Sequence, residues 1–172
     1  MGYTLIPGIP LSFEAIQAEG SMKMLAEQLA QFLAELHDFP TTSIARTTTS
    51  LSEFDPARRR QQWQQMYKDV YSTLEIHLTP TEFQRICQWW DTVLQDTSMN
   101  DFVSSLIHGD FWYENILVSS KELPSIVGVI DFEAAEIADP AQDLAVVQYL
   151  GIEFQTRVLN SYRRHRGMDE KP

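Results

Sequence analysis

The sequence is poor in cysteine and lacks long apolar runs. Cys87 is the single cysteine, so no disulfide can form within the chain. Its neighbours at helical spacing are Phe83, Ile86 and Trp90, which predicts a buried thiol and not a nucleophile. No apolar run approaches the ~18 residues that a membrane span requires, and nothing resembles a signal peptide. We therefore expect a cytoplasmic protein with no membrane partner.

Positive charge is also scarce. The chain has 13 Lys and Arg against 24 Asp and Glu, which gives a net charge of −11. This balance argues against a nucleic-acid partner, because neutralising phosphates requires a basic surface. A cationic small molecule or a metal fits the charge better, and the same acidity also keeps a protein in solution. With 172 residues, 44% of them hydrophobic, we expect one globular unit with a sizeable core.

The N-terminal part of the chain predicts mostly helix. Apolar residues at helical spacing follow Ser21, the expected N-cap, and stop before Pro40. These residues are Met22, Leu25, Leu29, Phe32, Leu33 and Leu36. Asp55-Pro56 predicts the start of a second long helix, and Thr79-Pro80-Thr81-Glu82 has the capping-box spacing that starts a third. Residues 41–52, rich in Thr and Ser, predict a loop between the first two.

The N-terminus and the C-terminal half predict short strands among further helices. Residues 3–6 predict a strand at the end of a sheet whose other strands are absent. Three further strands are expected at 102–107, 116–119 and 126–130, the last two as a hairpin with its turn at 121–125. Two last helices are expected, one from Asp139-Pro140 to Gly151 and one over 154–166. The fold class is therefore α+β, mostly helical, with a small β-hairpin.

Oxygen-bearing side chains follow these short elements. Asp110 and Asn115 lie in the loop before the hairpin, and Asp131 comes directly after its second strand. Since the hairpin folds back on itself, Asn115 and Asp131 fall at the same end and can share a cation. A few hard oxygen ligands open to solvent suit Mg²⁺, which keeps waters and binds substrate phosphates.

The same residues match a kinase signature, H-x-D-x-x-x-x-N followed by a strand and D-F-x. Here the signature reads His108-Gly109-Asp110, then Asn115, then Asp131-Phe132-Glu133. In kinases the first Asp orients and deprotonates the acceptor hydroxyl, while the Asn and the second Asp hold magnesium. The complete set in the expected strand context is far more specific than a lone H-G-D.

With glycine after the histidine, the sequence resembles the aminoglycoside phosphotransferase (APH) family, a branch of the kinase-like fold. Leu5-Ile6-Pro7-Gly8 is similar to the hinge of that family, and Leu36-His37 to the end of the helix after it. Asp139 to Ala145 matches its D-P-x-x-D-L-A motif. The resemblance covers nearly the whole chain and implies the C-terminal catalytic lobe of a kinase-like fold.

The resemblance implies a role for each matched residue. Asp110 would be the catalytic base, and Asn115 and Asp131 the ligands of Mg²⁺. His108 would orient the loop by hydrogen bonding, and Asp143 would support it from the following helix.

Other matched positions carry two interpretations each. Leu117 and Ile130 would lie under the base of ATP or GTP, or form plain hairpin core. Trp112 and Tyr113 would line the acceptor site, although packing of the loop is the simpler interpretation. His37 and Asp139 are expected to be structural, as a helix-end residue and an N-cap.

The sequence departs from the family in two ways. Glu133 stands where kinases have glycine after Asp-Phe, which alters either the backbone freedom or the charge beside the metal. No V-A-I-K-like segment is present, none of the four lysines falls in a strand pattern, and the seven glycines form no G-x-G-x-x-G. We therefore expect residues 1–12 to be a remnant of the interlobe hinge and residues 13–172 to be the catalytic lobe, truncated at both ends. The nucleotide lobe would be absent, and the isolated chain inactive.

Three functions stay open at this point. The first is phosphoryl transfer to an aminoglycoside-like acceptor, as in antibiotic resistance, or to choline, homoserine or a macrolide. The second is a non-catalytic remnant that binds a partner, or itself, through surfaces exposed by truncation. The third, a metal-dependent hydrolase using Asp110 and Asp131, leaves Asn115 and the hairpin context without an explanation.

Overall fold

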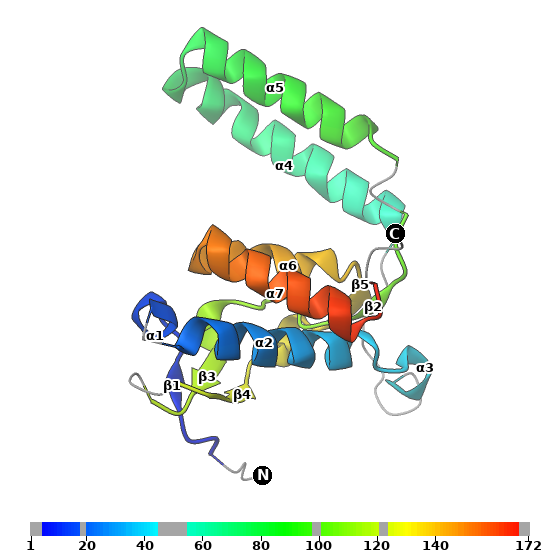
Figure 1. Cartoon of the computed structure of the whole chain (residues 1–172). Helices are drawn as coiled ribbons and strands as arrows, with labels where there is room; N and C mark the ends of the chain where they lie inside the picture. The colour runs from blue at the N-terminus through cyan, green and yellow to red at the C-terminus, as the bar shows by residue number, and fades with distance from the viewer. Residues whose placement is uncertain (1–4, 18–19, 45–54, 98–100, 121–123, 169–172) are drawn as a thin grey trace. The chain divides into compact units, whose positions relative to one another are not determined.

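The computed structural model describes residues 5–17, 20–44, 55–97, 101–120 and 124–168. It divides into two compact units, one formed by residues 1–52 and 104–172 and the other by residues 53–103. Helices dominate both units, and short antiparallel strands occur in the first (Figure 1). The mostly helical α+β class is confirmed. Within the described residues, no helix is both long and apolar enough to cross a membrane.

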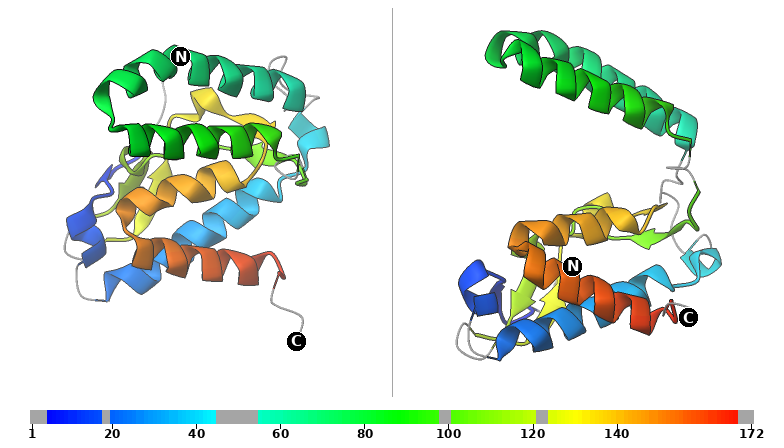
Figure 2. Two further views of the ribbon diagram at one scale, coloured as in Figure 1. Left: turned by 90° about the horizontal axis from the view of Figure 1, so that it is seen from above. Right: turned by 45° about the horizontal axis from the view of Figure 1, so that its top comes forward.

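The first unit is built on two helices that lie side by side, α2 (Ser21–His37) and α7 (Ile152–His165), as the views of Figure 2 show. Leu25, Leu29 and Leu33 of α2 are fully buried, so the predicted apolar stripe of this helix is confirmed. Shorter helical segments surround the pair: α1 (Phe13–Gln17), α3 (Thr41–Ile44), α6 (Ala141–Val146) and the 3₁₀ turn η4 (Val147–Leu150).

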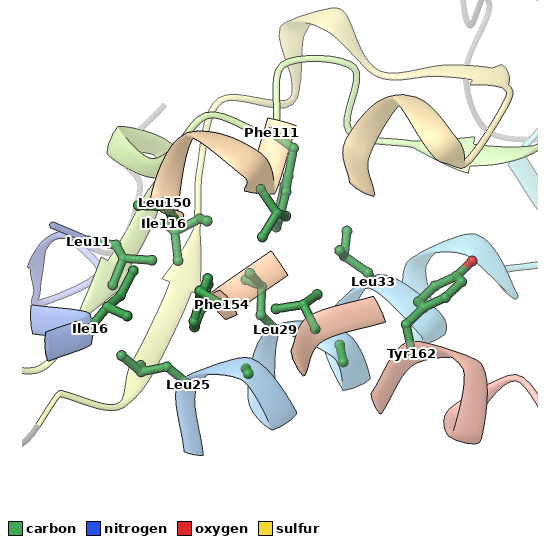
Figure 3. Packing of buried hydrophobic residues seen from close by; sticks show 14 of the residues in the cluster. Leu11, Ile16, Leu25, Leu29, Leu33, Phe111, Ile116, Leu150, Phe154 and Tyr162 are labelled. Atoms are coloured by element: carbon green, nitrogen blue, oxygen red, sulfur yellow. The ribbon is translucent and has the colours of Figure 1, made fainter. Parts of the chain in front are cut away.

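The core of the first unit joins these helices to the strands (Figure 3). Leu11 and Ile16 lie at one end of the labelled cluster, Tyr162 lies at the other, and Phe154 and Leu29 lie between them. Each of these side chains is at most 5% exposed. Burying a leucine or phenylalanine side chain contributes about 1.5–3 kcal/mol, so this cluster is the main source of stability of the unit.

The strands form two small antiparallel sheets. β1 (Ile9–Pro10), β3 (Ile116–Val118) and β4 (Ile126–Val129) make the first, in the order β1-β3-β4. β2 (Ser105–Ile107) and β5 (Glu136–Ala138) make the second. The predicted hairpin is confirmed, with Ile116 opposite Val129.

The N-terminal strand prediction was wrong. Leu5 and Ile6 form no strand, and residues 3 and 4 lie outside the described residues. The strand is instead Ile9–Pro10, and its partner β3 is in this chain. Pro10 fits this strand because proline is tolerated in an edge strand, where its nitrogen need not donate to a neighbour. Strand β5 was not predicted, because a segment of three residues that begins with a glutamate is too short to show the alternation of a strand.

Several boundaries also differ from the prediction. Gly20, with φ 77°, is the N-cap of α2, and Ser21 is its first residue. Glycine adopts this left-handed conformation without strain, and no side-chain hydrogen bond caps the helix at this position. Residues 41–44, expected in a loop, form α3, whereas residues 45–52 lie outside the described residues. The N-cap of α6 is Pro140 and not the predicted Asp139, although Asp139 Oδ1 accepts the Ala141 N–H at 2.9 Å.

The second unit is a pair of helices, α4 (Pro56–His77) and α5 (Pro80–Gln95). Both predicted starts are confirmed: Asp55 accepts the N–H groups of Ala57 and Arg58, and Thr79 and Glu82 form a full capping box. Aromatic rings then join the helices. The ring centroids of Tyr67 and Trp90 are 5.2 Å apart, and those of Tyr71 and Phe83 are 5.0 Å apart.

Cys87 on α5 is only partly buried, so the prediction of a buried thiol was wrong. Its thiol instead takes part in a hydrogen bond with Tyr67, and this bond, with burial, raises the pKa of Tyr67 to about 12. Phe83, Ile86 and Trp90, the predicted neighbours of Cys87, lie on the same face of α5. A pair of helices does not cover this face completely.

Candidate active site

The loop between β2 and β3 carries the signature residues. It leaves β2 at Ile107 and enters β3 through a 3₁₀ turn, η2 (Tyr113–Asn115). Gly109 has φ 79°, and a Cβ at this position would overlap the carbonyl oxygen of Ala134. Only glycine fits both the backbone conformation and the space. Phe111, 2% exposed, anchors the loop by stacking on Phe32 with ring centroids 5.9 Å apart.

Asp143 of α6 holds the start of this loop. Its side chain is buried, at 1% exposed, and Oδ2 accepts the His108 N–H at 2.8 Å. Oδ1 accepts the Gly109 N–H at 3.0 Å. Backbone donors paired with a buried carboxyl group give strong, directional bonds. The two bonds fix two successive peptides directly before Asp110.

His108 connects the loop to the second strand of the hairpin. Its Nδ1 accepts the Asp110 N–H at 3.3 Å, so the ring proton lies on Nε2, which donates to the Ile130 carbonyl at 2.9 Å. The ring is fully buried and lies 4.4 Å from the ring of Phe132 between centroids. One imidazole therefore ties the backbone of Asp110 to the residue that precedes Asp131.

Asn115 is oriented by Asp110. Its Nδ2 donates to the Asp110 carbonyl at 3.0 Å and approaches the Asp110 carboxylate Oδ2 at 3.5 Å. With the amide nitrogen used in this way, the amide oxygen is the group that can face a cation. Asp110 itself is exposed, so an acceptor molecule can reach its side chain.

At the end of the hairpin, Asn115 lies opposite Ile130, the residue directly before Asp131. Ile130 N donates to the Asn115 carbonyl at 2.9 Å, which continues the ladder beyond the Ile116 and Val129 pair. Asp131 follows with φ 66° and ψ 64°, the only non-glycine positive φ among the residues that the structure describes. Such a conformation costs of order 1 kcal/mol or more and is typical of functional sites.

A cavity of about 960 Å³ opens beside Asp131. Its lining residues are Leu5, Ile6, Leu117, Ile130, Asp131, Phe132 and Glu133. Leu117 is nearly buried and Ile130 is 38% exposed, so Ile130 is not simple hairpin core. The cavity has an apolar wall and an acidic end, and Glu133 belongs to that end. Gly8 lets the N-terminal segment approach the hairpin, because a Cβ there would lie 2.8 Å from Val127.

Aromatic side chains lie directly after Asp110. The ring of Trp112 is 4.9 Å from that of Tyr113 and 4.7 Å from that of Tyr149, between centroids. Tyr149 is 72% exposed, so the group presents aromatic surface to solvent. Sequence reasoning missed Tyr149, because no spacing connects η4 to the loop.

His37 also does more than its position at a helix end predicted. Its Nε2 lies 3.2 Å from Asp143 Oδ2, and its Nδ1 lies 2.8 Å from the Tyr162 hydroxyl. Both contacts are buried and join residues more than a hundred positions apart. No local pattern in the sequence could have indicated them.

The residues present suit magnesium better than a metal bound by protein alone. Among the described residues, no three or more His, Cys, Asp or Glu side chains cluster as a metal site. Asn115 and Asp131 offer hard oxygen ligands at the same end of the hairpin. Mg²⁺ is commonly held by one or two protein ligands together with water and phosphate oxygens.

Known proteins with related sequences were found by comparison. The chain is 30% identical to the uncharacterized protein YcbJ of Bacillus subtilis over 139 residues, which is 81% of this chain and 42% of YcbJ. It is 26% identical to the viomycin phosphotransferase of Streptomyces vinaceus over 156 residues, 90% of this chain and 51% of that enzyme. The chain thus spans about half the length of these relatives.

Solved structures of aminoglycoside phosphotransferases have a similar fold. A GDP and kanamycin complex of APH(2")-IIIa superposes with a TM-score of 0.74 at 22% identity, over 93% of this chain and 54% of that one. The sequence profile of the phosphotransferase enzyme family, APH, matches residues 3–172. The expected resemblance is confirmed, and this chain belongs to the phosphotransferase enzyme family.

Proposed function

We propose that this chain is the catalytic part of a small-molecule kinase that transfers the γ-phosphoryl group of ATP or GTP to a hydroxyl. The observation that carries the proposal is the hydrogen-bonded set of Asp110, Asn115 and the hairpin end at Asp131. Phosphoryl transfer needs a group that positions the nucleophile and a group that holds the metal, with little other covalent chemistry. This set offers both.

In this mechanism the Asp110 carboxylate accepts the proton of the acceptor hydroxyl. The hydroxyl oxygen forms a bond to the γ-phosphorus, the bond to the bridging oxygen breaks, and the nucleoside diphosphate leaves with that oxygen. Asn115 and Asp131 would hold Mg²⁺, which neutralises charge on the phosphates when bound. His108 and Asp143 keep Asp110 in place, since both act on the backbone of the loop.

The cavity beside Asp131 is proposed as the place of the nucleotide base. Leu117 and Ile130 would contact one face of the base, and Leu5 and Ile6 its edge. Kinases also grip the phosphates with a strand lysine. The lysines that the structure describes, Lys23 and Lys68, both lie in helices. We therefore propose residues 1–12 as the hinge and 13–172 as the catalytic lobe, with weak nucleotide binding and low activity in this chain alone.

We propose that the acceptor is a cationic, aminoglycoside-like compound that contacts Trp112 and Tyr149. The reaction would take place in the cytoplasm. Residues 101–150 carry nine Asp and Glu, one Lys and no Arg, so the region around Asp110 is acidic. Aromatic faces add attraction for a cation of about 0.5–2 kcal/mol. Solved proteins of similar fold bind kanamycin, gentamicin and streptomycin, and macrolide 2'-phosphotransferases share the fold as well, so a macrolide acceptor is the alternative to test.

Binding of a metal–nucleotide complex tests the proposal directly. We would add Mn²⁺ with ATP, and separately with GTP, to ¹⁵N-labelled protein and follow paramagnetic broadening. Amide signals of Asn115 and of residues 130–133 should broaden first, and Asp131→Asn should abolish this effect. Glu153→Gln, a matched change at an exposed site of α7, should leave it intact. Broadening that ignores Asp131→Asn would reject the site.

Turnover tests the role of Asp110. In a form of the protein that transfers phosphate, Asp110→Asn should lower kcat by about 10²–10⁴, the usual size of general-base assistance, with KM changed far less. Asp101→Asn, an exposed control in the second unit, should keep full kcat. Near-normal turnover of Asp110→Asn would require another base.

One observation favours a second candidate, a non-catalytic binding module. Leu5 is 87% exposed and Ile6 38%, so an apolar surface is available at the N-terminal segment. A protein partner, or a second copy, would cover this surface and compete with nucleotide for the cavity. Self-association that ATP or GTP does not weaken, together with no metal–nucleotide binding, would favour this candidate.

A further inference from the structure

A buried chain of polar side chains in the first unit extends from Asp143 to two residues, His37 and Tyr162, that the proposed chemistry does not use. It connects Tyr162 of α7, His37 of α2 and Asp143 of α6, which are 5%, 4% and 1% exposed. The Tyr162 hydroxyl is 2.8 Å from His37 Nδ1, and His37 Nε2 is 3.2 Å from Asp143 Oδ2. Buried polar groups are costly unless they are paired, so this chain needs a reason to exist.

The directions of its hydrogen bonds follow from Asp143. Both Asp143 oxygens already accept backbone N–H groups from His108 and Gly109. The third contact, from His37, must therefore be a donation by Nε2, which places the ring proton on that nitrogen. In a neutral ring His37 Nδ1 then carries the lone pair, and the Tyr162 hydroxyl donates a hydrogen bond to it.

The environment of Tyr162 suits a constant donor. Burial is the main cause that raises the pKa of Tyr162, so its hydroxyl keeps its proton at neutral pH. The ring meets that of His37 edge-on, with centroids 5.5 Å apart at 73°. Figure 3 shows Tyr162 at the Leu33 end of the core cluster, away from Leu11 and Ile16. Its ring is thus packed by the core, while its hydroxyl points out of it.

We propose that Tyr162 is a positioning residue for the loop that carries Asp110. Its hydroxyl fixes the tautomer and orientation of His37, His37 orients the Asp143 carboxylate, and Asp143 holds the peptides of His108 and Gly109. Helix α7 is thereby connected to the candidate base through three side chains. The effect on loop order stands on this geometry, whereas its importance for phosphoryl transfer rests on the proposed function.

Tyr162→Phe in the full chain tests the proposal, because phenylalanine keeps the packing and loses only the hydroxyl. We would measure hydrogen exchange of the His108 and Gly109 amides by NMR, and the His37 tautomer from its ring nitrogen signals. Losing one net hydrogen bond of about 0.5–1.5 kcal/mol should speed exchange at these amides by about two- to tenfold. Tyr71→Phe, the same change at a 40% exposed tyrosine of α4, should have no effect.

A role in packing alone would give a different result. It would speed exchange of core amides such as Leu29 and Val158 by the same factor as His108 and Gly109. Selective loss of protection in the loop therefore supports the proposal. Unchanged loop amides, or a uniform loss across the core, would overturn it.

A rescue variant adds a second test. Glutamine at position 37 carries an amide donor and has no tautomer to be set, so Tyr162→Phe with His37→Gln should recover most of the loop protection. No recovery would contradict the role given to the tautomer. If Tyr162→Phe does not fold, two variants of His37 replace it. His37→Gln should keep the loop amides protected from exchange, whereas His37→Leu should not. Equal protection in the two variants would overturn the proposal. These readouts need no turnover, so a failure of the proposed function leaves them interpretable.

Discussion

The two units of this chain are stabilised in opposite ways. In the first unit, α2 and α7 bury leucine, phenylalanine and tyrosine side chains in one cluster, and buried polar residues are paired across distant segments. In the second unit, neither α4 nor α5 contains a fully buried residue. Its recognisable supports are caps and aromatic pairs between neighbouring helices. The first unit therefore depends on long-range packing, which can hold a site rigid, and the second on local interactions.

The largest expected effect on stability comes from comparing a substitution at a buried residue of the first unit with one at an exposed residue of the second. Leu29→Ala in α2 should lower the free energy of unfolding by about 2–5 kcal/mol, because the side chain is fully buried and leaves a cavity. Ile76→Ala in α4, at a residue 78% exposed, should change it by less than about 0.5 kcal/mol. Urea unfolding of both variants gives the comparison. Equal losses would contradict it.

The next effect concerns the polar part of the first unit. Asp143→Asn places an NH₂ group against backbone donors, so stability should fall by about 1.5–3 kcal/mol, the range for hydrogen bonds to charged groups. The amide signals of His108 and Gly109 should shift as well. Asp69→Asn in α4, where the side chain accepts from Gln65 at the surface, is the matched control and should cost little. A neutral Asp143→Asn would show that the loop is held by other contacts.

A smaller effect is expected for the local supports of the second unit. Thr79→Ala removes the capping box of α5 and should cost about 1 kcal/mol. Three of the four tryptophans, Trp63, Trp89 and Trp90, lie in this unit, so fluorescence in a Trp112→Phe background reports on it alone. Thr79→Ala should move this fluorescence transition more than the unfolding of the first unit. A single common shift would mean that the units unfold together.

The smallest effect is electrostatic. A hydrogen bond from Ser161, with His165 and Arg164 beside it, lowers the pKa of Glu27 below its usual value near 4.5. A lowered folded-state pKa gives stability that is present above the unfolded pKa and is lost as pH falls through the folded one. Because Glu27 is exposed, we expect about 0.5 kcal/mol or less, lost below about pH 4.5. Glu27→Gln should remove this increment from the pH profile, whereas Glu35→Gln should not.

The difference between the units also separates what the sequence could predict from what it could not. Caps at Asp55 and Thr79 and the apolar stripe of α2 are local patterns, and each was predicted correctly. The pairing of β1 with β3, and the strand β5, depend on contacts between segments far apart in the chain. Short strands with a proline or a leading glutamate give no periodicity from which to infer them.

The candidate site divides in the same way. Motif spacing singled out Asp110, Asn115 and Asp131, because loop and hairpin residues that act together are close in sequence. Tyr162 and Tyr149 escaped notice, since only the packing of α7 and η4 brings them to the loop. The left-handed backbone of Asp131 was not predicted either, because aspartate tolerates this conformation without requiring it.

The central claim is that Asn115 and Asp131 share one divalent cation in the presence of nucleotide. Crystals grown with Mn²⁺ and a non-hydrolysable ATP analogue would test it through the anomalous signal of manganese. We predict one strong peak bonded to the Asn115 amide oxygen, an Asp131 carboxylate oxygen and phosphate oxygens of the analogue. If the two side-chain oxygens instead lie more than about 8 Å apart in an ordered hairpin, ligand distances of about 2.1 Å cannot bridge them, and the claim is wrong.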